Sequence, residues 1–264
     1  MPLTYYSRAA TREFWSEHWG GQDVEALLRV ARRSPLTALI ENALPRNGRI
    51  LEAGCGLGQY VILLREHGYA AVGVDWSLEA LTRCRKAAPT APVAVMELRA
   101  LALRTGGVAA YVSLGVVEHD PSGPAEIVTE ARRVLAPGGI LVLSVPYLNG
   151  ARRLFRGFLS RAQAKIRDRG GEFYQYGFTR SEVRDVLEAT GFRILSDTPY
   201  DPARVLRKAI RQLVGAHGSG AETRGPTADG TDRSLIRRLA RALLYTPPLL
   251  RFLGHMILFV AVKR

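Results

Sequence analysis

The feature that most constrains this chain is a glycine-rich turn placed directly after a short apolar strand. The run from Ile50 to Ala53 leads into Gly54-Cys55-Gly56-Leu57-Gly58, and a helical pattern follows up to His67. Glycine permits a tight turn and a close approach of the backbone to a ligand. The unpaired N–H groups at the start of the helix then face whatever occupies the turn. This pattern predicts a nucleotide-like ligand at the carboxyl end of the strand.

Two acidic residues flank the turn and narrow the choice of ligand. Glu52 precedes the glycines, and Asp75 ends the next apolar strand, where a carboxylate is placed to bind a ribose hydroxyl pair. Gly58 comes one position too early for the dinucleotide fingerprint G-x-G-x-x-G. The charge of Glu52 would also repel a pyrophosphate but attract an ammonium or sulfonium group. A positively charged nucleoside cofactor therefore fits better than a nicotinamide dinucleotide.

Apolar runs and helical patterns alternate along the first part of the chain. We expect strands at 49–53, 71–75, 93–97, 108–114 and 140–145, and helices at 11–19, 23–33, 58–67, 77–87 and 122–135. Asp23 and Ser77 are expected as N-caps, and Pro137-Gly138-Gly139 as the end of the fifth of these helices. Short apolar strands separated by helices favour an α/β fold with a doubly wound parallel sheet and helices on both faces.

With these residues the chain resembles the class I methyltransferases that use S-adenosylmethionine, with a type 11-like domain. The resemblance continues through the segments 93–97, 111–119, 132–140 and 178–192, and it includes a last strand at 255–262. It implies a Rossmann-like sheet that is mostly parallel with a reversed last strand. It also implies that S-adenosyl-L-methionine is the cofactor, and we assign no metal site.

The resemblance assigns roles to individual residues. Glu52 is assigned to the ammonium group of the cofactor, Asp75 to its ribose hydroxyls and Trp76 to its adenine. Glu97 stands where the family usually has an aspartate near the adenine amine, and Ala109-Ala110 stand where it often has another. The expected cofactor-binding residues are Glu52, Gly54, Cys55, Gly56, Gly58, Tyr60, Asp75, Trp76, Glu97, Leu98 and Leu114.

Methyl transfer needs an aligned acceptor and, for many acceptors, a base. His119 lies beside Glu118 after the fourth expected strand, so it is our candidate general base. The alternative is that Glu118-His119 caps a loop and a helix. The aromatic residues near the start form either an acceptor lid or packing for the first helix; they are Tyr5, Tyr6, Trp15 and Trp19. Further candidates for the acceptor pocket are Tyr147, Tyr174 and Tyr176.

Cysteine content and hydropathy indicate the cellular compartment in which the protein is expected. The two cysteines form no disulfide framework, which fits a reducing cytosol, and Cys55 is expected as a small spacer in the turn. The start of the chain lacks the apolar region of a signal peptide. Prolines and charged residues interrupt the most apolar stretch, 243–262, so no transmembrane helix is expected. We expect a cytoplasmic protein that could also lie on the inner face of the membrane.

Basic residues are concentrated in the second part of the chain. Residues 1–149 hold 15 Lys+Arg and 14 Asp+Glu, whereas residues 150–264 hold 22 and 10. Basic amphipathic helices are expected at 152–169, 203–214 and 234–244, with a mobile loop at 215–232. Three interpretations stay open: a solvated face, a patch for an anionic membrane surface, and a nucleic-acid site, for which no binding module is recognisable.

Together these observations predict four segments and one activity. The segments are an N-terminal helical part at 1–45, a methyltransferase domain at 46–199, a basic helical insertion at 200–254 and the last strand of the sheet at 255–264. The resemblance implies methyl transfer to a small-molecule or lipid-linked acceptor, with oxygen as the expected acceptor atom. The alternative is a non-catalytic protein of the same fold that binds a membrane surface or a partner.

Overall fold

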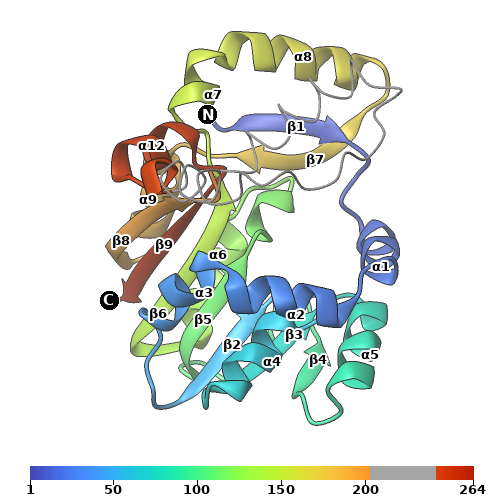
Figure 1. Cartoon of the computed structure of the whole chain (residues 1–264), viewed down its shortest axis with the longest axis vertical. Helices are drawn as coiled ribbons and strands as arrows, with labels where there is room; N and C mark the ends of the chain where they lie inside the picture. The colour runs from blue at the N-terminus through green and yellow to red at the C-terminus, as the bar shows by residue number, and fades with distance from the viewer. Residues whose placement is uncertain (203–241) are drawn as a thin grey trace, which may run out of the picture.

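The computed structural model describes residues 1–202 and 242–264 (Figure 1). Its centre is a seven-stranded sheet in the order β4-β3-β2-β5-β6-β9-β8. The pairs among β2 to β6 are parallel, whereas β9 is antiparallel to both of its neighbours. These strands are β2 (Arg49–Ala53), β3 (Ala70–Asp75), β4 (Val93–Val95), β5 (Val108–Leu114), β6 (Leu135–Pro146), β8 (Phe192–Tyr200) and β9 (Met256–Lys263). The mostly parallel sheet with a reversed last strand is confirmed.

Helices cover both faces of this sheet, because successive strand residues point to opposite sides. Ile50 packs into one apolar cluster and its neighbour Leu51 into another, and both side chains are fully buried. Most of the helical residues in the Ile50 cluster come from α2 (Val24–Arg33), α3 (Pro35–Glu41) and α4 (Gln59–Glu66). The helices of the Leu51 cluster are α6 (Ala125–Val134) and α9 (Arg180–Ala189).

Side-chain caps fix where several helices begin. Thr11, Asp23 and Ser77 each accept a hydrogen bond from the backbone N–H three positions on, which satisfies a donor that the helix leaves unpaired. The helices expected at 11–19, 23–33 and 77–87 are thereby confirmed as α1 (Arg12–Gly20), α2 and α5 (Leu78–Ala87). The short helix α3 was missed, although Ser34 caps it and Pro35 occupies its first turn.

A small second sheet was also missed. Strand β1 (Leu3–Ser7) pairs antiparallel with β7 (Glu172–Gly177), so the N-terminal segment is not wholly helical. Figure 1 shows this ribbon beyond the carboxyl ends of the parallel strands, with a long helix lying along it. The paired residues are about 170 positions apart in the chain, so no local sequence pattern predicts this two-stranded sheet.

Two expected boundaries are corrected. The basic helix expected at 152–169 is two helices, α7 (Gly150–Leu154) and α8 (Arg156–Asp168), because the backbone of Phe155 leaves the helical conformation. The first of them begins earlier than expected because Asn149 caps it. Helix α6 ends at Val134, and β6 starts at once, so Pro137-Gly138-Gly139 lies within the strand rather than ending the helix.

Several expectations concern residues that the structure does not describe. The helix expected at 203–214 and the loop expected at 215–232 lie outside the described residues, as does the helix expected at 234–244 apart from its last three positions. Helix α12 (Pro247–Leu253) leads into β9. In the described ranges no helix is long and apolar enough to cross a bilayer.

Candidate functional site

The glycine turn adopts backbone conformations that other residues rarely reach. Gly54, Gly56 and Gly58 have φ angles of +77°, +52° and +72°. A Cβ atom on Gly54 would lie 2.5 Å from a methyl carbon of Val116. Gly54 and Cys55 both donate their N–H groups to the carbonyl of Val74, which ties the turn to β3. The turn is therefore held open and close to the neighbouring strand, as the sequence predicted.

A cavity of about 320 Å³ opens beside this turn. It lies at the carboxyl ends of β2, β3 and β5, which is where parallel α/β sheets bind ligands. Nine of the twelve predicted site residues line it: Glu52, Gly54, Cys55, Asp75, Trp76, Glu97, Leu98, Leu114 and His119. Residues of the strand ends and of the loop after β5 are thus brought together around one volume.

The other three predicted residues support the turn from outside the cavity. A Cβ atom on Gly56 would lie 2.6 Å from the ring of Trp19, and one on Gly58 would lie 2.4 Å from Sγ of Cys84. Tyr60 is buried in the cluster beneath α2 and α3, and burial raises the pKa of its phenol. Gly56, Gly58 and Tyr60 therefore shape the turn and the first helix after it.

Glu52 is buried with one oxygen unsatisfied. Its side chain lines the cavity, the residue is 3% exposed, and Oε2 has no hydrogen-bond partner among the described residues. Burial, with a smaller contribution from the neighbouring Asp75, raises the pKa of Glu52 to about 8. The carboxyl group is therefore protonated at neutral pH until a positive group approaches it. A buried acceptor facing a cavity fits a cationic ligand group, which would both complete its hydrogen bonding and favour its ionised form.

Asp75 is fixed by the backbone on both oxygens. Oδ2 accepts the N–H of Gly56 at 2.8 Å, and Oδ1 accepts the N–H of Ser77 at 2.9 Å. Burial raises the pKa of Asp75, and these backbone hydrogen bonds act in the opposite direction. Each oxygen keeps a second lone pair, so the carboxylate can still accept hydrogen bonds from a pair of hydroxyls at the cavity wall.

The far end of the cavity carries an ion pair that the sequence did not reveal. Arg99 Nε lies 3.6 Å from Glu97 Oε1 and 3.5 Å from Asp120 Oδ2. All three residues line the cavity, and the Asp120 side chain is 3% exposed. Asp120 is a missed site residue. Its position directly after Glu118-His119 was the available signal.

His119 lies on the short helix η1 (Val117–His119), and one of its two ring nitrogens is engaged in a hydrogen bond. Its Nδ1 is 2.8 Å from the carbonyl oxygen of Tyr174, and because a carbonyl only accepts, Nδ1 carries the proton. Burial lowers the pKa of His119, so the ring is neutral near pH 7 and Nε2 keeps its lone pair. This is the tautomer that a general base needs.

Aromatic rings surround His119. Trp15 meets its ring edge-on with centroids 4.9 Å apart, and Tyr174 does so at 5.0 Å. Trp15 and Trp19 of α1 line the cavity, whereas Tyr5 and Tyr6 lie on β1. The helix α1 therefore supplies part of the cavity wall, and its tryptophans line the cavity; their role as an acceptor lid stays a prediction.

Glu118 is a second buried carboxyl group, behind the cavity rather than in its wall. It is 2% exposed, its Oε2 has no hydrogen-bond partner in the part of the chain that the structure describes, and burial raises its pKa to about 8. Its Oε1 lies 4.0 Å from Nε2 of His119. At neutral pH the carboxyl is therefore neutral, and it places no full charge beside the histidine.

The sheet order and the site define a class of protein. A parallel sheet with a reversed strand, a glycine turn after β2 and an acidic residue ending β3 is the arrangement of class I methyltransferases. Residues 51–143 match the family model described as "Methyltransferase domain". This part of the chain is thus similar to the methyltransferase family, and its fold is that of class I S-adenosylmethionine-dependent methyltransferases.

Comparison with individual proteins agrees with this family. A relative from Mycolicibacterium smegmatis, described as a probable S-adenosylmethionine-dependent methyltransferase, is 27% identical over 58% of this chain. That match covers 66% of the relative, just under two thirds of its length. An Archaeoglobus fulgidus structure described as a SAM-dependent methyltransferase superimposes with a TM-score of 0.58 at 16% identity, over 95% of this chain and 99% of that one.

A third comparison concerns a protein solved with the cofactor. The Haemonchus contortus phosphoethanolamine N-methyltransferase 2 in complex with S-adenosyl-L-methionine superimposes with a TM-score of 0.55 at 18% identity. The match covers 86% of this chain and 51% of that one. Likeness at this level shows a shared fold.

Proposed function

We propose that this chain transfers a methyl group from S-adenosyl-L-methionine and holds that cofactor in the cavity beside the glycine turn. The observation that carries the proposal is the unsatisfied Oε2 of Glu52, buried in the cavity wall. Glu52 would hold the ammonium group and Asp75 the ribose hydroxyls. Trp76, Glu97 and Leu98 would enclose the adenine. The bound cofactor supplies an activated methyl group, so the protein's task is mainly alignment.

His119 is proposed as the general base. Its neutral ring, fixed by the Tyr174 carbonyl, can take a proton at Nε2 from an acceptor that lies in the aromatic part of the cavity. Because burial already disfavours the charged ring, the acquired proton would be released readily to solvent or product. Glu118 beside it is neutral, so it does not stabilise the protonated histidine as a charged carboxylate would.

The proposed acceptor is a small or lipid-linked molecule methylated at oxygen. Support comes from the walls near His119, where Trp15 and Trp19 offer flat apolar surfaces beside a basic nitrogen. A hydroxyl must lose its proton on methylation, which is the step that a neutral histidine assists. Amine acceptors form the comparison group in the assay below, since one structural neighbour is a phosphoethanolamine N-methyltransferase.

We also propose that the protein docks peripherally on the inner face of an anionic membrane. Three apolar side chains of α7, α8 and their junction are largely exposed: Leu154 at 73%, Phe155 at 59% and Phe158 at 72%. Arginines of the same helices stand beside them. Apolar side chains at the lipid boundary with arginines on anionic head groups are the features of an interfacial helix. The other two basic segments lie outside the described residues.

Calorimetry with S-adenosylhomocysteine tests cofactor binding directly. Wild-type protein should bind, and Glu52→Gln should lose about tenfold or more in affinity, because a charge-assisted hydrogen bond is replaced by a neutral one. Glu79→Gln, an exposed glutamate on α5, is the matched control and should bind as the wild type does. No heat of binding with the wild-type protein would end the proposal.

A methyl-transfer assay over a panel of hydroxyl and amine acceptors tests catalysis and acceptor chemistry. Transfer to hydroxyl compounds supports the proposal as stated, and transfer to amines alone would overturn its oxygen part. Cofactor binding without transfer to any acceptor would favour the non-catalytic alternative.

A further inference from the structure

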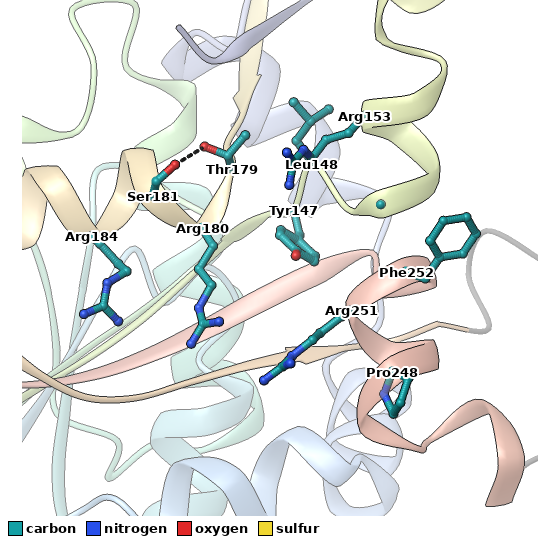
Figure 2. A pocket seen from close by; sticks show the side chains of 11 residues that line it. Tyr147, Leu148, Arg153, Thr179, Arg180, Ser181, Arg184, Pro248, Arg251 and Phe252 are labelled. Atoms are coloured by element: carbon teal, nitrogen blue, oxygen red, sulfur yellow. Dashed lines mark hydrogen bonds between the residues drawn. The ribbon is translucent and has the colours of Figure 1, made fainter.

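A second cavity, of about 720 Å³, lies where β6 ends, bordered by α7, α9 and α12 (Figure 2). It shares no lining residue with the cavity beside the glycine turn. Of the described residues that line it, four are arginines and none is acidic. The residues that line it are Tyr147, Leu148, Gly150, Arg153, Thr179, Arg180, Ser181, Arg184, Pro248, Arg251 and Phe252. The proposed methyl transfer leaves this cavity without a role.

The positive charge of the cavity is only partly neutralised. Arg180 and Arg184 share the buried carboxylate of Asp197, at 2.6 and 3.3 Å. No carboxylate of the described residues lies within ion-pair distance of Arg153 or Arg251. Two guanidinium groups therefore line the cavity with no compensating carboxylate among the described residues, which favours an anionic ligand.

Tyr147 adds a hydroxyl group to this positively charged cavity wall. The residue is 8% exposed, and its hydroxyl has no hydrogen-bond partner among the described residues. In the view of Figure 2 Tyr147 lies between Arg153 above and Arg180 and Arg251 below. Burial raises the pKa of the Tyr147 phenol, and the charges of the three arginines act in the opposite direction. A phenol at the cavity wall can donate a hydrogen bond to a ligand that accepts it.

The walls of the cavity are held in place by specific contacts. Asn149, 1% exposed, donates to the carbonyl of Gly254 at 2.7 Å and accepts the N–H of Arg152 at 2.8 Å. A Cβ atom on Gly150 would lie 2.5 Å from the ring of Phe252, so glycine allows α7 and α12 to approach closely. Arg153 and Arg251 are thus carried on two helices whose relative position is fixed.

We infer that this cavity binds a phosphate group. Two uncompensated guanidinium groups match the two negative charges of a phosphate monoester, and arginine presents donors in a geometry that fits phosphate oxygens. The hydroxyl groups of Tyr147 and Ser181 supply further donors from the cavity wall. A single carboxylate would leave one positive charge unmatched. The phosphate could belong to a soluble phosphomonoester or to the head group of a phosphatidic acid.

Binding of inorganic phosphate to the full chain tests the inference, measured by calorimetry with acetate as the comparison anion. Wild-type protein should bind phosphate more tightly than acetate. The double variant Arg153→Gln, Arg251→Gln should lose about tenfold or more in phosphate affinity, and Tyr147→Phe should lose several-fold. Arg29→Gln, an exposed arginine on α2, is the matched control and should leave the affinity unchanged.

Two vesicle preparations separate the sources of the phosphate. If vesicles of phosphatidylcholine and phosphatidic acid bind the protein and inorganic phosphate displaces it, the head group reaches the cavity. If binding to these vesicles is insensitive to phosphate, or equals binding to phosphatidylcholine alone, the ligand is soluble. The inference is overturned if wild-type protein binds phosphate no better than acetate, or if the folded double variant binds phosphate as the wild type does.

Discussion

Gly58 and Cys84 approach each other so closely that the turn has no room for a side chain. A Cβ atom on Gly58 would lie 2.4 Å from Sγ of Cys84, whose residue is completely buried. Cys84 belongs to α5 and Gly58 begins α4, so the contact joins the two helices that follow β2 and β3. The last glycine of the turn is therefore required by packing as well as by its φ of +72°.

Replacing Gly58 by alanine should destabilise the fold by about 2 to 4 kcal/mol, as the sum of backbone strain and overpacking. Gly68→Ala is the matched control, because Gly68 has a φ of +83° but nothing within 4 Å of its Cβ position. It should lose about 1 kcal/mol. Urea unfolding of both variants measures the difference, and equal losses would contradict the packing argument.

Stability should fall as pH rises through the range in which Glu52 titrates. Burial raises its folded-state pKa from 4.5 to about 8, so the folded protein holds a proton that the unfolded chain has released. The stabilisation is complete below about pH 4.5 and is lost as the pH rises to about 8, at roughly 1.4 kcal/mol per pKa unit. Urea unfolding of the ligand-free protein at several pH values should show this decline.

The variant Glu52→Gln separates this effect from other titrations. It should reduce the pH slope but not abolish it, because burial also raises the pKa of Glu118 to about 8. Glu79→Gln, at an exposed position, should leave the slope as in the wild type. An unchanged slope in Glu52→Gln would mean that the carboxyl does not hold its proton in the folded state.

Replacing His119 by glutamine should lower kcat/KM by about a hundredfold or more, because the general base is removed. The affinity for S-adenosylhomocysteine should change little, because the contacts to the cofactor stay. In the wild type, burial lowers the pKa of His119, so the rising limb of kcat/KM should lie at a lower pH than an unperturbed histidine would give. His67→Gln, at an exposed histidine, is the control. Equal loss of activity and cofactor affinity in His119→Gln would indicate a structural role.

Replacing Phe155 and Phe158 by serine should reduce binding to vesicles that contain phosphatidylglycerol about tenfold or more, because two exposed aromatic side chains no longer enter the lipid boundary. Flotation of the full chain measures this. Leu78→Ser, at a residue 68% exposed on α5, removes exposed apolar surface elsewhere and should have no effect. Identical flotation of all three proteins would exclude docking through α7 and α8.

The parts of the fold and of the site that are specified by residues close together in the sequence could be predicted. A few consecutive residues are enough to specify a turn, a helix cap or a strand. The structure has these features where the sequence indicated them: the turn from Gly54 to Gly58, the caps Asp23 and Ser77, and the strand 108–114. The carboxylates Glu52 and Asp75 followed from the turn, because parallel strands end at the same edge of the sheet.

The missed parts depend on residues far apart in the chain. Strands β1 and β7 form only because each offers an edge to the other, and their sequences alone do not specify that pairing. Arg153 and Arg251 meet in one cavity across about a hundred positions. Tyr60 follows the turn closely in sequence, yet the helix that begins at Gln59 directs it into the core, which the glycine spacing does not indicate.

The place of β9 between β6 and β8 restricts the order in which a newly made chain can assemble. Strand β8 pairs with β9 and has no other neighbour among the described strands, so it gains its strand partner only after residues 256–263 have left the ribosome. The parallel part, from β2 to β6, needs none of these residues. During translation β6 should therefore present an open edge until the last strand arrives, and this is the interval in which a chaperone would be of most use.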